Sequence, residues 1–262
     1  MTLIIGIRCA DGIVLGADTR TTYGVMGQPT IRQDDSFKLQ LLCGEKAILG
    51  VSGPVGLAQR FAGEIGRMYS EKKLQGTSDQ VMTAIRVALW EKHIAMEMQV
   101  AAVARQVIGG VASESVLCST LLAYPVGGNA CLFTFDQQGA PEQAKDNIVF
   151  YAIGSAQPRA DPFLAFLRRT FWKEKVPSVL DGIFATLWTL DYVIQSDPGA
   201  VGGVPRIAVL EKKGKEWIAR QLDDAELEEH RQIVAAATAH LAGFARAPTK
   251  GGTEGEGVPP PA

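Results

Sequence analysis

The sequence predicts an α+β fold in which two antiparallel β-sheets pack face to face between outer helical layers, an α/β/β/α four-layer sandwich. Two observations predict it. Strand-like and helix-like segments come in groups, in the order strands, two helices, strands, two helices, strands, helix. Short turns join the paired strands, which favours antiparallel hairpins over the regular strand–helix alternation that builds a parallel sheet.

The first fifty residues predict two hairpins. The β-branched segments TLIIGIRC (2–9) and GIVLGAD (12–18) meet at Asp11-Gly12, a tight-turn signal. FKLQLLC and KAILGVSG form a second pair that turns at Gly44-Glu45. Between the hairpins, TTYGVMGQPT (21–30) carries Gly and Pro and predicts a loop.

Helical spacing begins at residue 54. Apolar residues recur at every third or fourth position over 54–72, with Pro54 as the first helical residue. GTSD (76–79) supplies the cap of a long helix running towards Val107, which Gly109-Gly110 ends. The later predicted strands are 116–125, 130–139, 147–154, 204–212 and 216–222, and the later predicted helices are 158–172, 178–196 and 223–245.

These elements predict one domain over residues 1–246. The chain of 262 residues is long enough to bury a substantial core. Its last segment, APTKGGTEGEGVPPPA (247–262), is rich in Gly, Pro and Glu and nearly free of apolar residues. Such a composition predicts a disordered C-terminal tail.

Composition excludes several classes of function. The formal net charge of −2 gives no reason to expect nucleic acid or an anionic membrane as a partner. No apolar run approaches the ~20 residues of a membrane-spanning helix. Arg8 and Asp11 interrupt the N-terminal apolar segment before it could resemble a signal peptide.

The cysteine pattern indicates a reducing compartment. Cys9, Cys43, Cys118 and Cys131 are scattered through apolar segments without a CxxC spacing, so we expect free buried thiols and a cytoplasmic protein. Neither an H-E-x-x-H motif nor a Cys/His cluster is present, so no metal site and no cofactor are predicted.

The residue after the initiator Met could carry chemistry. A threonine hydroxyl becomes a nucleophile only when a base takes its proton, and a free α-amino group on the same residue can be that base. An ammonium nearby would lower the pKa of the amine, and backbone N–H groups would have to face the developing oxyanion. Removal of Met1, which a small second residue permits, would turn Thr2 into such a residue.

The rest of the chain can supply the supporting groups. Asp18 ends the strand that pairs back against the first strand, which can bring its carboxylate beside Thr2. Lys38 lies among strand residues, where an inward ammonium would require a partner. Ser52-Gly53-Pro54 lies where a strand ends and a helix begins, a position that presents N–H groups to anions.

Four segments together resemble a known family. GIVLGADTR (12–20), KL (38–39), GVSG (50–53) and AIGS (152–155) are similar to the proteasome-type β-subunit family of threonine peptidases, N-terminal nucleophile (Ntn) hydrolases. That family includes a bacterial two-component ATP-dependent protease and the ancestral-β (Anbu) homologues. The resemblance covers residues 2 to about 220 in element order, and the long segment between Arg20 and Lys38 favours a divergent, Anbu-like branch.

The resemblance implies a role for each matching residue. Thr2 would be the nucleophile and its amine the base, and Ser155 would hydrogen-bond that amine. Asp18 and Lys38 would form the supporting ion pair, with Gly53 as the oxyanion N–H. The implied supporting residues are Arg20 and, approximately, Asp197, because SDPGAVGG (196–203) is shifted by one residue and carries Val201 where a Ser is usual.

The implied function is that of a threonine-type endopeptidase. It would act on peptides or unfolded proteins inside a self-compartmentalised homo-oligomer, a ring or a helical stack. An ATPase unfoldase is a further partner that the resemblance allows, and the chemistry needs no cofactor.

Two other functions fit the same fold: a non-peptide amidohydrolase of the Ntn class, or a catalytically silent structural subunit. Residue by residue, simpler interpretations also exist: an ordinary strand threonine at Thr2, a hairpin-end ion pair of Asp18 with Arg20, and a surface lysine at Lys38. A serine nucleophile in GVSGP is disfavoured because Pro54 replaces the second Gly of a nucleophile elbow. The segment AMEMQV (95–100) predicts ordinary helix packing.

Overall fold

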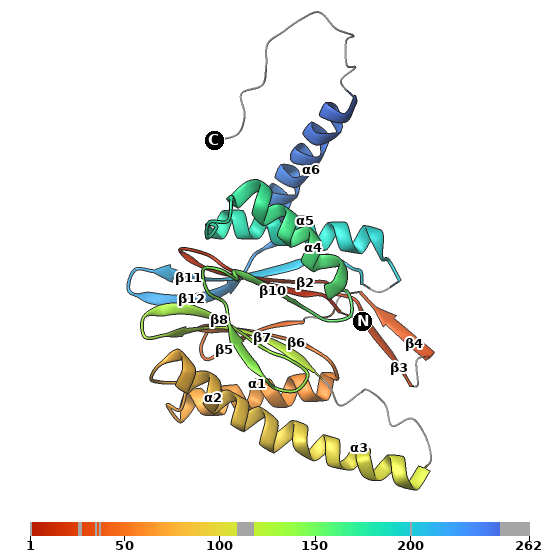
Figure 1. Cartoon of the computed structure of the whole chain (residues 1–262), viewed down its shortest axis with the longest axis vertical. Helices are drawn as coiled ribbons and strands as arrows, with labels where there is room; N and C mark the ends of the chain where they lie inside the picture. The colour runs from red at the N-terminus through yellow and green to blue at the C-terminus, as the bar shows by residue number, and fades with distance from the viewer. Residues whose placement is uncertain are drawn as a thin grey trace, which may run out of the picture.

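The computed structural model of the chain is a four-layer sandwich, as predicted (Figure 1). The structure describes residues 2–25, 28–34, 36, 38–108, 118–199 and 201–246. One sheet has the order β10-β1-β2-β11-β12 and the other the order β5-β6-β7-β8-β9, with every neighbouring pair antiparallel. Helices α4 and α5 cover the first sheet, and α1 and α2 cover the second (Figure 1). The two sheets therefore share an inner core.

The first sheet is built by residues from both ends of the chain. Its strands are β1 (Ile4–Arg8), β2 (Gly12–Ala17), β10 (Phe150–Ile153), β11 (Arg206–Lys213) and β12 (Glu216–Gln221). The predicted first hairpin is confirmed: β1 pairs with β2 so that Ile4 lies opposite Ala17. This register brings residue 18 back to the start of the chain.

The second sheet is formed by the middle of the chain. Its strands are β5 (Leu39–Leu42), β6 (Ala47–Ser52), β7 (Ser119–Val126), β8 (Asn129–Phe135) and β9 (Pro141–Gln143). The predicted hairpin at Gly44-Glu45 is confirmed by the β5–β6 pairing. The three-residue β9, which pairs with β8, was not predicted, because so short a segment has no readable alternation.

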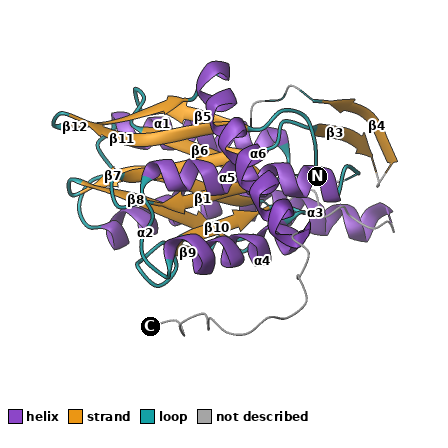
Figure 2. Ribbon diagram, turned by 90° about the horizontal axis from the view of Figure 1, so that it is seen from above, coloured by secondary structure: helices purple, strands orange, loops and turns teal. Residues whose placement is uncertain are grey.

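The segment predicted as a loop, residues 21–30, is instead largely strand. β3 (Thr21–Val25) and β4 (Gln28–Gln33) form a separate two-stranded sheet with a register shift between Tyr23 and Gly24. The loop prediction was wrong because Gly and Pro were taken as breakers, whereas a two-stranded ribbon tolerates both at its edges and irregularities. This hairpin extends from the sandwich beside the N-terminus (Figures 1 and 2).

The helices lie where the apolar spacing predicted them. They are α1 (Val55–Ser70), α2 (Ser78–Leu89), α3 (Ala95–Ile108), α4 (Gln157–Leu167), α5 (Val179–Ser196) and α6 (Asp224–Arg246). Pro54 is the N-cap of α1 rather than its first residue, and Thr77 forms a capping box with Gln80 at α2. Gly109-Gly110 and the predicted disorder of 247–262 lie outside the described residues.

The predicted long helix from residue 78 is interrupted by a π-helical segment, η1 (Trp90–Ile94), and a similar segment, η3 (Arg168–Trp172), follows α4. The wider turn of η1 brings Lys92 within 2.8 Å of Glu64 on α1, where Arg67 also binds. Beyond η1, α3 leaves the body. The expected packing of AMEMQV is not seen among the residues that the structure describes, where Met96 and Met98 are 51% and 42% exposed.

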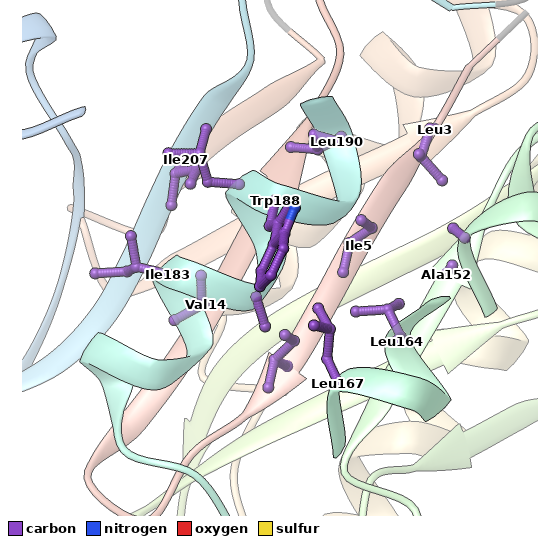
Figure 3. Close-up of a cluster of buried hydrophobic side chains, with 14 of the residues drawn as sticks. Leu3, Ile5, Val14, Ala152, Leu164, Leu167, Ile183, Trp188, Leu190 and Ile207 are labelled. Carbon is purple, nitrogen blue, oxygen red and sulfur yellow. The ribbon is translucent and has the colours of Figure 1, made fainter. Parts of the chain in front are cut away.

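Three layers of apolar side chains hold the sandwich. One lies between the two sheets, and another between the second sheet and helices α1 and α2. The third joins the first sheet to the helices above it, and Figure 3 shows Ile183, Trp188 and Leu190 of α5 over Val14 and Ile5. Burial of this extent on both faces fixes the strand register, because a one-residue slip would turn every side chain to the opposite face.

Candidate active site

The carboxylate of Asp18 is the centre of a buried polar cluster at the end of β2. Its side chain is 0% exposed and accepts four hydrogen bonds. Oδ1 accepts from the backbone N–H of Leu3 at 2.9 Å and from Lys38 Nζ at 2.6 Å. Oδ2 accepts from the backbone N–H groups of Arg20 and Gly202, each at 3.3 Å. A carboxylate with this many donors is compatible with full burial.

Lys38 is the charged partner of Asp18. It lies one residue before β5, and its side chain is 8% exposed. Burial lowers the pKa of the Lys38 ammonium, and the charge and hydrogen bond of Asp18 oppose that shift. The interpretation of Lys38 as an outward-facing surface lysine is therefore wrong.

Thr2 lies two residues before β1, next to the junction of β10 and α4. Its backbone nitrogen donates to Ser155 Oγ at 3.1 Å, and its carbonyl oxygen accepts from the N–H of Ala156 at 3.3 Å. The carboxylate of Asp18 accepts from the N–H of Leu3, the residue after Thr2. Asp18 therefore binds the peptide group that joins Thr2 to Leu3. The structure thus brings Thr2, Asp18, Lys38 and Ser155 together.

Gly154 shapes the space around Thr2. Its φ is +105°, and a Cβ built on it would overlap the carbonyl oxygen of Thr2 and lie 3.1 Å from Ser52 Oγ. Only glycine permits both the backbone conformation and this close approach. The ends of β1, β6 and β10 therefore converge on the peptide of Thr2.

Gly53 lies at this convergence, between the end of β6 and the first turn of α1. It is exposed and has a φ of +148°, outside the range that L-residues usually adopt. Its backbone is therefore available to solvent, next to the helix start where N–H groups collect. This position is compatible with the oxyanion role that the sequence predicts.

Arg20 pairs with Asp34, so the predicted hairpin-end ion pair of Asp18 with Arg20 is wrong. Nε and Nη2 donate to the two carboxylate oxygens of Asp34 at 2.6 and 2.9 Å. Nη1 donates to the carbonyls of Pro198 and Val201 at 2.5 and 3.3 Å. These hydrogen bonds to Asp34 raise the pKa of the Arg20 guanidinium.

Asp197 caps the end of α5 and is not joined to the Asp18 cluster by its side chain. Its carboxylate lies 2.8 Å from Arg159 Nη1, on the first turns of α4. Its carbonyl accepts from the N–H of Val201, which is buried at 0% exposure. The segment 196–203 departs from the family pattern in sequence, with Val201 where a Ser is usual. In the structure the side chain of Val201 packs into the core.

Three residues of the site were not predicted: Asp34, Gly154 and Gly202. Asp34 lies between the segment predicted as a loop (21–30) and the second predicted hairpin, where the sequence offered no pattern to follow. Gly202 contributes only backbone groups: its N–H binds Asp18, and its carbonyl accepts from Thr19 and Arg20. Of the two glycines, only Gly154 gave a usable signal, because it lies between a strand and a helix, where a Gly often marks a close approach of backbone.

Other residue types bear on the remaining kinds of site. Over the described ranges, no group of three His, Cys, Asp or Glu side chains could hold a metal ion. The three histidines lie on η1 and α6. All four cysteines are buried and unpaired, also as predicted. No helix among the described residues is long and apolar enough to cross a membrane.

Comparisons with known proteins agree with this geometry. The family described as "Proteasome subunit" matches residues 2–171, more than half of the chain. No curated protein sequence matches. Among solved structures, a mutant of Anbu from Hyphomicrobium sp. strain MC1 is similar, with 19% identity, a TM-score of 0.64, and coverage of 98% of this chain and 100% of that chain.

Two further structures share the fold. Anbu (ancestral beta-subunit) from Yersinia bercovieri has 17% identity and a TM-score of 0.64, over 94% of this chain and 98% of that chain. The helical assembly of the Anbu complex from Pseudomonas aeruginosa has 18% identity and a TM-score of 0.64, over 95% of this chain and 100% of that chain. The resemblance and the fold class predicted from the sequence are therefore confirmed.

Proposed function

Because the chain belongs to the proteasome subunit family, we propose that it is a threonine-type endopeptidase whose nucleophile is Thr2, exposed by removal of Met1. One observation carries the proposal. The buried pair of Asp18 and Lys38 is held beside the peptide of Thr2, whose nitrogen lies within hydrogen-bond distance of Ser155 Oγ. A buried ammonium beside a terminal amine lowers the pKa of that amine, which can then act as a neutral base.

The first step is attack on the substrate. Once Met1 has left, the neutral amine of Thr2 takes the proton of its own Oγ1, which then adds to the carbonyl carbon of the scissile peptide bond. The exposed N–H of Gly53 is the donor for the oxyanion that forms on the carbonyl oxygen. Collapse breaks the C–N bond, the departing amine takes the proton from the Thr2 ammonium, and an ester on Thr2 remains.

The second step releases the acyl product. Water gives one proton to the Thr2 amine and adds to the ester carbonyl, and the returned proton restores the Oγ1 hydroxyl when the ester breaks. The positive charge of Lys38 keeps the amine neutral, and Asp18, which also accepts from the N–H of Leu3, holds Lys38 in place. Ser155 orients the amine through the contact that its Oγ makes with the Thr2 nitrogen.

The proposal extends to the surroundings of the enzyme. The substrate is a peptide or an unfolded protein, because a main-chain carbonyl next to an amide is what this site would activate. The working form is a homo-oligomer in the cytoplasm, supported by the four unpaired thiols and by the helical assembly reported for Pseudomonas aeruginosa Anbu. An ATPase unfoldase would supply extended substrates.

The test combines mass and hydrolysis. We expect the intact mass to lack one Met, and Thr2→Ala to abolish hydrolysis of fluorogenic peptides without changing the fold. Thr2→Ser, which keeps a hydroxyl, should retain measurable turnover, and Thr83→Ala on the exposed face of α2 should behave as wild type. Retained Met1 with undiminished hydrolysis would refute the mechanism.

The same assay separates the two alternatives. Hydrolysis of small non-peptide amides but not of peptides would indicate an amidohydrolase that uses the same Thr2. Absence of both activities in a Met1-free protein would indicate a structural subunit.

A further inference from the structure

The last helix carries one apolar stripe that is buried in its first half and exposed in its second. The stripe follows heptad spacing along α6, at Leu227, Val234, Ala237, Leu241 and Phe244, with the polar His230 at the one remaining heptad position. Leu227 and Val234 are 0% and 7% exposed and pack into the core above the first sheet. Leu241 and Phe244 continue the stripe but are 49% and 69% exposed.

The charge along α6 changes at the same point. Its first eight residues, 224–231, contain four acidic residues and one arginine, as expected for a surface helix. The next fourteen, QIVAAATAHLAGFA (232–245), contain no Asp, Glu, Lys or Arg. A helix end that extends from the body, as α6 does in Figure 1, normally carries charges on the face that meets water. This end has the composition of a covered helix.

A second uncovered apolar surface lies on α4, η3 and α5. We call it the aromatic shelf: its exposed members are Phe166, Phe171, Leu180 and Tyr192, and beneath them lie the partly buried Phe163 and Phe184 and the buried Trp188. Positions 180, 184, 188 and 192 recur every four residues along α5, so they form one line. Phe163 stacks on Tyr192 with ring centroids 4.5 Å apart. Phe166 and Tyr192 remain 51% and 45% exposed.

The sixteen residues that follow α6 offer little apolar material to cover either surface. The sixteen residues after α6, APTKGGTEGEGVPPPA, contain Val258 as their only branched aliphatic residue and no aromatic residue. Both surfaces belong to the same helical layer of the sandwich, on the side from which α6 extends (Figure 1). A contiguous exposed apolar patch of this kind marks an interaction site.

We propose that the last two turns of α6 pack on the aromatic shelf of a second copy of this chain, and that the second copy returns the same contact. Such a two-fold arrangement buries both uncovered surfaces at once, because each copy supplies one of each. Aromatic anchors that enter an apolar surface are the usual source of binding energy at such interfaces. The inference specifies one contact of the homo-oligomer proposed above and rests on that part of the proposal.

The first test is the mass of the assembly, measured by light scattering after size exclusion. We expect Leu241→Asp with Phe244→Asp to lower the mass at least twofold at micromolar concentration, and Phe166→Asp with Tyr192→Asp to do the same. Ala239→Asp, on the opposite face of α6, and removal of residues 247–262 should leave the mass unchanged. A wild-type monomer, or an unchanged mass in both double variants, would overturn the inference; so would a loss of mass on removing the tail.

The second test traps the contact without disturbing the fold. One copy carries Phe244→Cys and a differently tagged copy carries Phe166→Cys, and the native thiols are all buried. Mild oxidation should give a disulfide between the two tags, whereas Ala239→Cys with Phe166→Cys should give at least tenfold less. Equal yields would overturn the inference. Peptide hydrolysis by wild type and by Thr2→Ala, measured separately, shows whether the proposed activity itself has failed.

Discussion

Asp34 accepts two parallel hydrogen bonds from the guanidinium of Arg20, with Oδ1 2.6 Å from Nε and Oδ2 2.9 Å from Nη2. The remaining nitrogen of Arg20 reaches the carbonyls of Pro198 and Val201. The next residue in that loop, Gly202, donates to Asp18. The pair thus links the β3–β4 hairpin to the loop that holds the buried carboxylate.

Asp34→Asn should lower turnover more than substrate affinity. The amide keeps one acceptor but loses the bidentate, charge-assisted geometry, so Arg20 and the 198–202 loop should shift. Small displacements of catalytic groups can reduce rates by up to about 100-fold, and we expect kcat to fall by about 10- to 100-fold with KM little changed. Steady-state kinetics measure this. Asp224→Asn, which alters the exposed pair with Arg206, is the matched control, and equal kcat values in the two variants would contradict the prediction.

Lys38→Met should reduce both activity and stability. The thioether fills most of the space of the lysine stem, but the fully buried Asp18 loses its ammonium partner. Removing one partner of a buried pair costs about 3–5 kcal/mol of unfolding free energy. Urea unfolding measures that loss, and peptide hydrolysis should fall at least 100-fold.

Lys46→Met is the control for that variant. Lys46 lies 3.4 Å from Glu216 in an exposed pair, and exposed pairs contribute about 0–1 kcal/mol. A similar loss of stability in the two lysine variants would show that burial of Lys38 has no energetic consequence.

Gly154→Ala should disturb Thr2 directly. The new methyl would meet the carbonyl of Thr2 while the backbone holds a φ of +105°, which costs about 1–3 kcal/mol in strain alone. We expect hydrolysis to fall at least 10-fold in a protein that still folds. Gly127→Ala has a positive φ of +59° but open space around its Cβ, so it should keep wild-type hydrolysis. Equal activity in the two variants would refute the role assigned to Gly154.

Glu64→Gln should change how stability depends on acid. Hydrogen bonds from Arg67, and less so from Lys92, lower the pKa of the Glu64 carboxyl from 4.5 to about 2. A depressed folded-state pKa stabilises the protein above pH 4.5, and this stabilisation is lost as the pH falls towards 2. The difference in unfolding free energy between wild type and Glu64→Gln should therefore be largest near neutral pH and shrink below pH 4. Chemical unfolding at several pH values measures it, and a difference independent of pH would contradict the assignment.

The sequence was most informative where side chains repeat or cap. The hairpins at Asp11-Gly12 and Gly44-Glu45 follow from turn chemistry, and the helix at Thr77 follows from its capping box. The position of Asp18 beside Thr2 could be predicted because the pairing of β1 with β2 carries residue 18 back to residue 2, whereas the pairing of Asp18 with Lys38 was implied by the family resemblance. These are local rules with long-range consequences.

The remaining features depend on contacts that no local pattern encodes. The β3–β4 hairpin contains residues that usually break strands, and the π-helical turn at Trp90–Ile94 lies within a helical pattern that predicted an uninterrupted α-helix. Asp34 and Gly202 act through partners 14 and 184 residues away. Such partners become visible only when the whole chain is folded, because neither residue type nor spacing distinguishes them from surface residues.

The four hydrogen bonds to Asp18 also constrain when the site can form. They come from residues 3, 20, 38 and 202, so the last donor follows the first by nearly the whole length of the domain. Contacts between distant segments form late in folding, because the chain must first close a long loop. A nascent chain that has left the ribosome only as far as α5 cannot complete the cluster. The order of synthesis thus delays assembly of the Asp18 cluster until almost all of the sandwich is in place.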